Sequence, residues 1–110
     1  MTFEELYSII IDRKKNAVAN SYVSKLFASG RDRIIQKVGE EAVEVIIAAK
    51  NSDKKEIVSE TSDLIMHLFV MLAEAEVSVD DILGELQERR KKTKKKKTKG
   101  KMINFTNSIR

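Results

Sequence analysis

The chain has 110 residues, a length that allows one compact domain. It contains no cysteine and one histidine, which excludes a disulfide framework, a thiolate metal site and a histidine-rich zinc centre. The lack of proline and the presence of only four glycines disfavour a turn-rich all-β fold. Because its apolar stretches are too short to cross a bilayer, we expect a soluble, cytoplasmic protein without a membrane partner.

Charge is divided unevenly along the chain. Residues 1–88 hold ten basic and all 17 acidic side chains, a net charge of −7, whereas residues 89–110 hold the other 11 basic side chains. We therefore expect an acidic helical domain over residues 1–90 and a basic tail over residues 91–110. The tail has no apolar face to bury and is expected to be disordered. A nucleic-acid interpretation would depend on the tail alone.

Hydrophobic periodicity and capping residues predict five helices and no strand. The helices are expected over residues 3 to about 14–16, 22–29, 31–50, 54–76 and 79–90. Four of them are preceded by a side chain suited to an N-cap, namely Thr2, Ser21, Asp53 and Ser78. The predicted fold class is all-α, a bundle of about five helices built around an antiparallel pair of long helices.

The two long helices are apolar around most of their circumference. On the first of them the expected inward stripe consists of Ile35, Val38, Ala42, Val45, Ile46 and Ala49. Val43 and Ile47 lie off this stripe and still need burial. A well-filled monomeric bundle is one interpretation. We favour completion by further copies of the chain, in a homo-oligomer whose simplest form is a dimer.

Each long helix also carries one polar stripe. At about 100° per residue, the stripes consist of Lys37, Glu40, Glu41 and Glu44 on the first helix and Glu56, Glu60, Asp63 and His67 on the second. The connection between the helices, around residues 51–53, is short and therefore favours antiparallel neighbours. Residues equally far from the turn then lie level, which pairs Glu44 with Glu60 and Glu41 with Asp63.

Four carboxylates that converge in a partly apolar environment need a cation, and Lys37 and Arg33 compensate them only in part. Ligation by carboxylate oxygens suits Mg²⁺ or Mn²⁺ and does not suit zinc. Such an ion indicates phosphate hydrolysis by a metal-oriented water. The alternative is a solvated acidic face. A solvated face explains less well why both helices carry acidic rows at matching heights, because like charges four residues apart destabilise a helix.

The residues of these stripes resemble a known family. The stretch EEAVE at 40–44 followed by ETSD at 60–63 resembles the EExxE…ExxD signature of all-α nucleoside triphosphate pyrophosphohydrolases, the MazG-like superfamily. The flanking stretches 21–50 and 63–86 resemble phosphoribosyl-ATP pyrophosphohydrolase, which acts second in histidine biosynthesis. The resemblance covers roughly residues 3–90, and it is specific because several motifs occur in order and at the right spacing.

The resemblance implies Mg²⁺-dependent hydrolysis of phosphoribosyl-ATP to phosphoribosyl-AMP and pyrophosphate. It implies metal ligands at Glu41, Glu44, Glu60 and Asp63. Glu40 would be a further ligand, a group that supports the ligands, or the base for the attacking water. Catalytic roles therefore fall on Glu40, Glu41 and Glu44.

Four other side chains near the stripes have candidate roles. Lys37, Arg33 and Lys25 are expected to bind substrate phosphate. His67 is expected either to hydrogen-bond a ligand carboxylate or to contact substrate, and the alternative is a core histidine with a satisfied ring.

Two other functions remain open at this point. The first is a house-cleaning nucleoside triphosphate pyrophosphohydrolase of broader specificity, which turnover of ordinary triphosphates would reveal. The second is a helical module that binds nucleic acid through the lysine-rich tail, which truncation after Arg90 would test. We expect no sequence-specific nucleic-acid partner.

Overall fold

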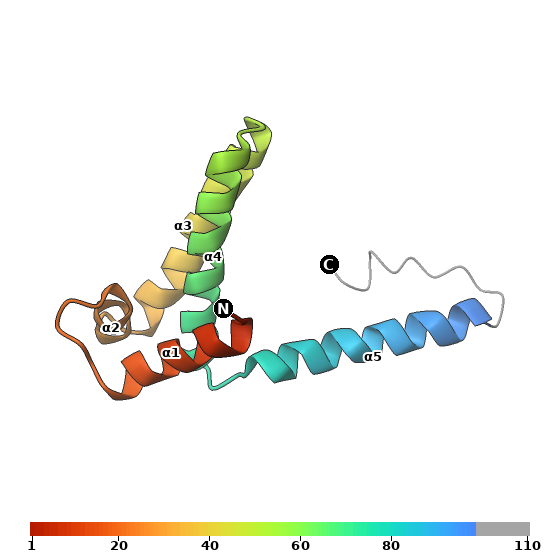
Figure 1. The fold of residues 1–110 in the computed structure, drawn as a ribbon, viewed down its shortest axis with the longest axis horizontal. Helices are drawn as coiled ribbons and strands as arrows, with labels where there is room; N and C mark the ends of the chain where they lie inside the picture. Colours follow the sequence, from red (N-terminus) through yellow and green to blue (C-terminus); the bar gives the residue numbers. More distant parts are fainter. Residues whose placement is uncertain (99–110) are drawn as a thin grey trace. The chain divides into compact units, whose positions relative to one another are not determined.

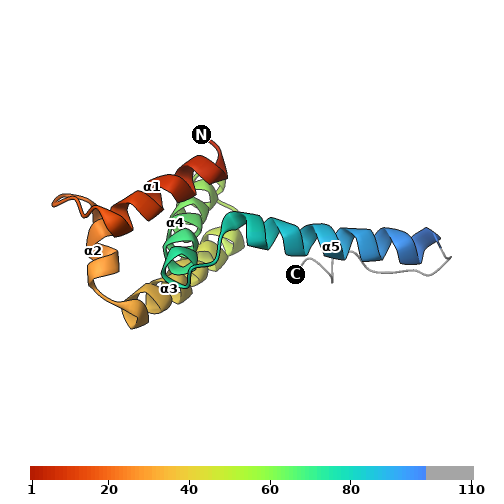
Figure 2. The same cartoon turned by 90° about the horizontal axis from the view of Figure 1, so that it is seen from below.

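The structure, a computed structural model, describes residues 1–98, which form five α-helices and no strand (Figures 1 and 2). The helices are α1 (Phe3–Lys15), α2 (Tyr22–Ala28), α3 (Arg31–Lys50), α4 (Lys54–Glu74) and α5 (Val79–Thr98). The predicted all-α class and the five helices are confirmed. The chain divides into two compact units, one over Met1–Val77 and a second that begins at Ser78.

The helices begin where the sequence places capping side chains. Thr2, Ser21 and Asp53 each accept a hydrogen bond from the backbone N–H three residues later, at 3.1, 3.2 and 3.1 Å. Ser78 and Asp81 exchange two such bonds, of 2.9 and 3.0 Å, in a reciprocal capping box. Because each cap satisfies a backbone donor that the helix leaves unpaired, it stabilises its helix by about 1 kcal/mol.

Helices α3 and α4 form an antiparallel hairpin, as predicted from their short connection (Figure 1). The chain reverses at Ser52, which has a left-handed φ of 54°. The hairpin is the longest element of the first unit, and α1 and α2 pack near the end that lies away from the turn (Figures 1 and 2).

The core of the first unit takes side chains from four helices. The buried cluster consists of Ile10 of α1, Leu26 of α2, Ile34 of α3, and Val70 and Ala73 of α4. A cluster of this kind fixes the open ends of the hairpin against α1 and α2. Among the helices of the first unit, α3 and α4 share the most contacts, and these contacts hold the region near the turn.

The face that α3 buries differs from the predicted stripe. Its fully buried residues are Ile34 and Ala48, whereas Ile35 and Ile46 are 46% and 64% exposed. The partly buried side of α3 also carries the polar side chains of Lys37 and Glu41. The side of the helix that faces the core is therefore not the side with the most apolar residues.

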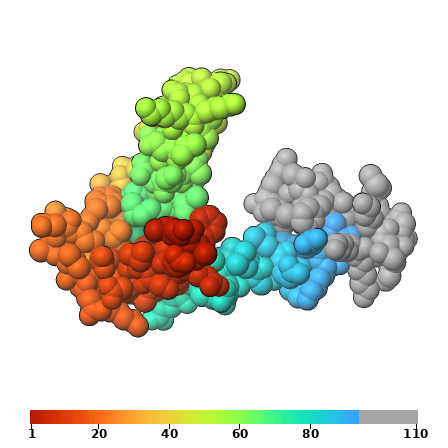
Figure 3. Space-filling model, in the orientation of Figure 1, coloured from red at the N-terminus to blue at the C-terminus, as the bar shows by residue number. Residues whose placement is uncertain are grey.

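The turn half of the hairpin keeps large apolar side chains on its surface. Val43, Ile46 and Ile47 of α3 and Val58 of α4 are all about half exposed or more. In the space-filling view this end of the hairpin projects beyond α1 and α2 (Figure 3). The first unit therefore does not bury all the apolar side chains of its two long helices, as the sequence predicts.

Helix α5 continues to Thr98, past the end near Arg90 that we expected, and so includes part of the segment predicted to be disordered. Lysine and arginine are good helix formers. Ion pairs within the helix support it, with Arg89 to Glu85 at 3.2 Å and Lys91 to Glu88 at 3.4 Å. The remainder of that prediction falls on residues 99–110, outside the described residues. Among residues 1–98, no helix combines the length and apolar character required to cross a membrane.

Candidate metal and phosphate site

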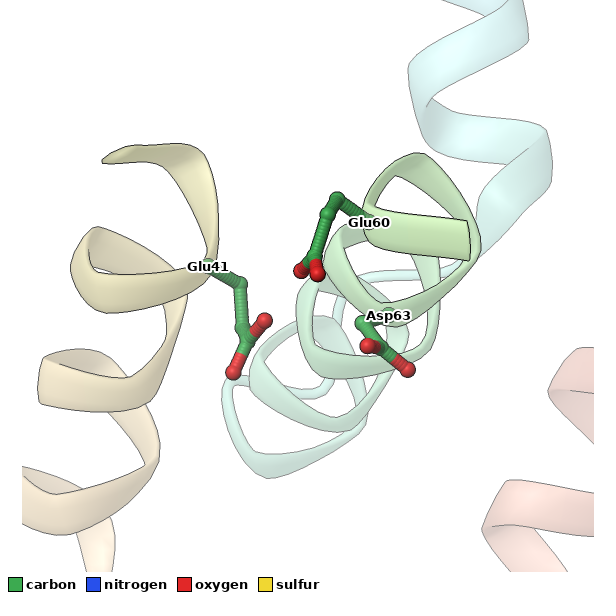
Figure 4. Close-up of side chains that lie close together, drawn as sticks. All are labelled: Glu41, Glu60 and Asp63. Atoms are coloured by element: carbon green, nitrogen blue, oxygen red, sulfur yellow. The ribbon is translucent and has the colours of Figure 1, made fainter. Parts of the chain in front are cut away.

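Three carboxylates from the two long helices converge on one point. Glu41 of α3 and Glu60 and Asp63 of α4 lie close together (Figure 4), and each offers an oxygen within 4.8 Å of the other two. The antiparallel register brings Glu41 level with Asp63, as the distances of these residues from the turn indicate. We call these three residues the carboxylate cluster.

Glu44, the fourth predicted ligand, lies beside the cluster and is not part of it. It is exposed, and together with Glu56 and Glu60 it lines a pocket of about 110 Å³ on the side of the cluster nearer the turn. Glu44 and Glu60 therefore lie near each other, as the register of the hairpin predicts. Among the described side chains, those of residues 1–93, no ion pair involves Glu44, which lines the pocket.

The cluster is electrostatically unfavourable without a cation. Partial burial raises the pKa of Glu60 above its ordinary value of 4.5, and the negative charges of Glu44, Asp63, Glu41 and Glu56 raise it further. A carboxyl group that resists ionisation among other carboxylates is a group whose charge a bound cation would stabilise. This charge imbalance, and a donor set made only of oxygen, fit a hard divalent ion such as Mg²⁺ or Mn²⁺.

Positive charge lies on the other side of the cluster, toward the start of α3. Lys37 Nζ is 3.2 Å from Glu41 and 3.7 Å from Glu40, and Arg33 is 3.6 Å from Glu40. The hydrogen bond to Glu41 raises the pKa of Lys37, although burial opposes this effect. Glu40 thus lies among cations and outside the carboxylate cluster. The site is polarised, with acids near the turn and cations near the open end.

His67 is buried, and both of its ring nitrogens have partners. Nδ1 lies 2.6 Å from the backbone oxygen of Asp63, and Nε2 lies 2.9 Å from the hydroxyl of Tyr22. The expected hydrogen bond to a ligand carboxylate is therefore absent: His67 reaches Asp63 at its backbone. The contact with Tyr22 was not predicted, since no local pattern in the sequence shows where α2 packs on α4.

Lys25 is the remaining predicted phosphate contact. It is exposed on α2, one turn after Tyr22, and no ion pair joins it to the carboxylate cluster. The structure therefore brings Lys37 to the cluster and Arg33 to the neighbouring Glu40, while Lys25 stays a prediction.

Comparison with known proteins places the chain in a family. The model of the family described as phosphoribosyl-ATP pyrophosphohydrolase matches residues 3–90. A protein of Clostridium novyi (strain NT), named phosphoribosyl-ATP pyrophosphatase, is 49% identical over 100 residues, which cover 91% of each chain. A protein of the same name from Methanosarcina acetivorans is 53% identical over 92 residues, covering 82% of this chain and 88% of that protein.

A third relative of that name, from Bacillus thuringiensis (strain Al Hakam), is 49% identical over 88 residues, or 80% of this chain and 82% of that protein. In all three cases the aligned region covers most of both chains. Similarity of this extent, together with the match over residues 3–90, shows that the chain belongs to the phosphoribosyl-ATP pyrophosphohydrolase family.

Proposed function

We propose that this chain hydrolyses phosphoribosyl-ATP to phosphoribosyl-AMP and pyrophosphate, as a step of histidine biosynthesis, with Mg²⁺ as its cofactor. Family membership supports the reaction and the substrate. The observation that carries the site is the convergence of the three clustered carboxylates next to Lys37.

The residues that would hold the ion are Glu41, Glu60 and Asp63. When bound there, Mg²⁺ or Mn²⁺ supplies an oriented water and neutralises charge on the phosphates. The two helices hold one carboxylate oxygen from each of these three residues within 4.8 Å of the others. Helix α3 also keeps the Lys37 ammonium 3.2 Å from Glu41, so that cation and carboxylates share one site.

Lys37 and Arg33 meet the charge of the substrate's phosphates in this proposal. In the reaction, an oxygen of water bonds to the α-phosphorus, and the bond from that phosphorus to the α–β bridging oxygen breaks, so that pyrophosphate leaves. Cations at the leaving side stabilise the charge that develops there. Glu40 holds Arg33 and Lys37 in place through ion pairs of 3.6 and 3.7 Å. Lys25 adds a phosphate contact from α2.

Glu44 has two candidate roles that one pair of measurements separates. As a fourth ligand it would complete the ion's shell, and as a base it would take the proton of the attacking water. Glu44→Gln weakens Mn²⁺ binding in the first role. In the second role it weakens Mn²⁺ binding only modestly, through the loss of a nearby negative charge, and its main effect is a lower kcat. Manganese titration followed by paramagnetic resonance gives the affinity, and pyrophosphate release gives kcat.

We also propose that the chain acts as a homo-oligomer, in the simplest form a dimer. The support is the exposed apolar surface on the turn half of the hairpin, carried by Val43, Ile46, Ile47 and Val58. Exposed apolar surface of this kind is typical of an interface between subunits.

The proposed function is tested by turnover of phosphoribosyl-ATP in the presence of Mg²⁺, compared with a panel of ordinary nucleoside triphosphates. We expect phosphoribosyl-ATP to be strongly preferred and activity to vanish with a chelator and return with Mg²⁺. Equal turnover of the ordinary triphosphates would instead indicate the house-cleaning enzyme. Full activity in the chelator would exclude the metal proposal.

A further inference from the structure

The last part of α5 carries a dense run of positive charge. Residues 89–98 consist of two arginines, six lysines and two threonines, with no acidic or apolar residue. The backbone of this stretch is helical to Thr98. We call these residues the basic end of α5. The proposed hydrolysis does not use them, because its phosphate-binding cations lie on α2 and α3 and the matched family region ends at residue 90.

The charge of the basic end is distributed around the helix. At about 100° per residue, its eight basic positions fall on all sides of the helix. Arg90 and Lys92 are exposed and form no ion pair among the side chains of residues 1–93. Arg89 and Lys91 pair with glutamates one turn earlier, at 3.2 and 3.4 Å, on the helix surface. Exposed ion pairs contribute little stability, so exchange of these glutamates for another anion costs little.

The density of this charge matches that of the backbone of duplex DNA. At about 1.5 Å per residue, residues 89–98 span about 15 Å. Duplex DNA carries one phosphate per about 1.7 Å of its axis, hence about nine phosphates over the same length. An α-helix with its side chains is about 10–12 Å wide, and the major groove of DNA is about 12 Å wide. A helix that is charged on all sides therefore reaches the phosphates on both sides of that groove.

Two other anionic partners fit the basic end less well. A helix that lies in a membrane surface buries an apolar face, and residues 89–98 contain no apolar residue. Against a flat anionic surface, the cations on the far side of the helix would stay in water. The major groove of duplex RNA is deep and narrow, so a helix does not enter it in the same way. The shape and charge of this helix therefore favour DNA.

We propose that the basic end of α5 docks in the major groove of duplex DNA and binds its phosphates without reading the base sequence. Six of its eight cations are lysines, which act as point charges on flexible stems and do not fix one pattern of base contacts. The proposal is independent of the proposed hydrolysis, since it concerns a part of the chain that the hydrolysis does not use.

The first test titrates the full chain against a fluorescently labelled DNA duplex of about 20 base pairs at several salt concentrations. Neutralisation of about six phosphates predicts that log affinity falls with log salt concentration at a slope of about −5. Two duplexes of unrelated sequence should bind within about threefold of each other, because phosphate contacts carry no sequence information. A slope near zero, or a strong preference for one sequence, would overturn the proposal.

Removal of four cations tests the location of the binding surface. The variant is Lys94→Gln, Lys95→Gln, Lys96→Gln, Lys97→Gln. Glutamine is a good helix former, so the helix should persist while the slope becomes shallower by about three and affinity at physiological salt falls at least about a hundredfold. The control changes four exposed lysines of the first unit to glutamine, namely Lys15, Lys50, Lys54 and Lys55. It alters net charge equally, so equal losses in both variants would refute binding at the basic end.

Replacement of Thr93 tests whether the helix itself is needed. Thr93→Pro keeps every charge but interrupts the helix within the basic end. The control, Thr93→Ala, removes only the side-chain hydroxyl, which donates to the backbone oxygen of Arg89 at 2.9 Å. We expect Thr93→Pro to bind duplex DNA at least about fivefold more weakly than Thr93→Ala, because the broken helix must be ordered on binding. Equal affinities would refute docking of a helix in the groove.

Competition separates duplex DNA from the other anionic partners. Per unit of negative charge, unlabelled duplex DNA should displace the label at least about fivefold better than duplex RNA of the same sequence or vesicles of phosphatidylserine. Equal or better competition by the vesicles would assign the basic end to a membrane surface. Equal or better competition by duplex RNA would assign it to RNA, and either result would overturn the DNA proposal.

Discussion

Lys37 and Glu41 lie one turn apart on α3 and form an ion pair of 3.2 Å in which neither side chain is more than 19% exposed. The lysine thus partly neutralises the very carboxylate that a divalent ion would use. In our proposal, a bound cation and Lys37 would therefore compete for Glu41 while both attract substrate phosphate. This relation makes opposite predictions for metal binding and for catalysis.

Replacement of Lys37 by Gln should strengthen metal binding and weaken catalysis. Removal of a positive charge beside Glu41 raises the negative potential at the cluster, so Mn²⁺ should bind several-fold more tightly. The same change removes a cation from the phosphates, and kcat/KM should fall at least about tenfold. Manganese titration and pyrophosphate release measure the two effects. Weaker Mn²⁺ binding would show that Lys37 supports the ligand geometry and does not oppose the ion.

Glu60→Gln should stabilise the metal-free protein at neutral pH. Since the pKa of Glu60 is raised in the fold above its ordinary 4.5, the folded state binds more protons than the unfolded state between these two values. Stability is therefore lost as pH rises through that window, and the variant should lack this loss. Thermal melting between pH 4 and 8 in a chelator is the measurement, with Glu4→Gln, an exposed site on α1, as control.

Glu41→Gln and Asp63→Asn should abolish hydrolysis while the fold stays intact. Each variant removes one negative carboxylate charge from the cluster, so the repulsion among the remaining carboxylates falls in the metal-free state. Far-ultraviolet circular dichroism should match the wild type for both variants. The melting temperature should be equal or higher for Asp63→Asn, whereas Glu41→Gln also loses the ion pair with Lys37. Loss of the helical signal together with activity would assign these side chains a structural role.

The double variant Ile46→Ser, Val58→Ser should dissociate the proposed oligomer. These side chains are 64% and 67% exposed in the single chain, so their replacement costs the isolated fold little. Light scattering should report the monomer mass at micromolar concentration. Val18→Ser, at a site 45% exposed between α1 and α2, should leave the mass unchanged. A wild type that already scatters as a monomer would refute the oligomer.

A chain that ends at Arg90 should keep kcat/KM within about twofold of the full chain. The matched family region ends at residue 90, and the cations that bind phosphate in our proposal, Lys37 and Arg33, lie on α3. Loss of hydrolysis in the shortened chain, with circular dichroism of the first unit retained, would make the basic segment part of the active site.

Local chemistry explains what could be predicted from the sequence. The caps at Thr2, Ser21, Asp53 and Ser78 depend on bonds between residues three apart, and each is present. The register of the hairpin follows from its short connection, and it places Glu41, Glu60 and Asp63 together. Both inferences need only the helical repeat and one turn.

Contacts between distant segments explain what could not be predicted. The face that α3 buries is set mainly by its packing against α4, so Ile46 is exposed although its pattern indicates an inward position. The bond between Tyr22 and His67 joins residues on helices whose packing no local pattern fixes. The end of α5 depends on the balance between helix propensity and repulsion among lysines, which composition alone does not decide.

The three clustered carboxylates all belong to one hairpin closed by a connection of three residues, 51–53. Closing so short a loop costs little chain entropy, so this pair of helices can form early, before the rest of the chain has collapsed. A nascent hairpin would then already offer a chelating geometry. Divalent ions in the folding medium should accelerate refolding, and the catalytic centre would act as a template for the architecture that surrounds it.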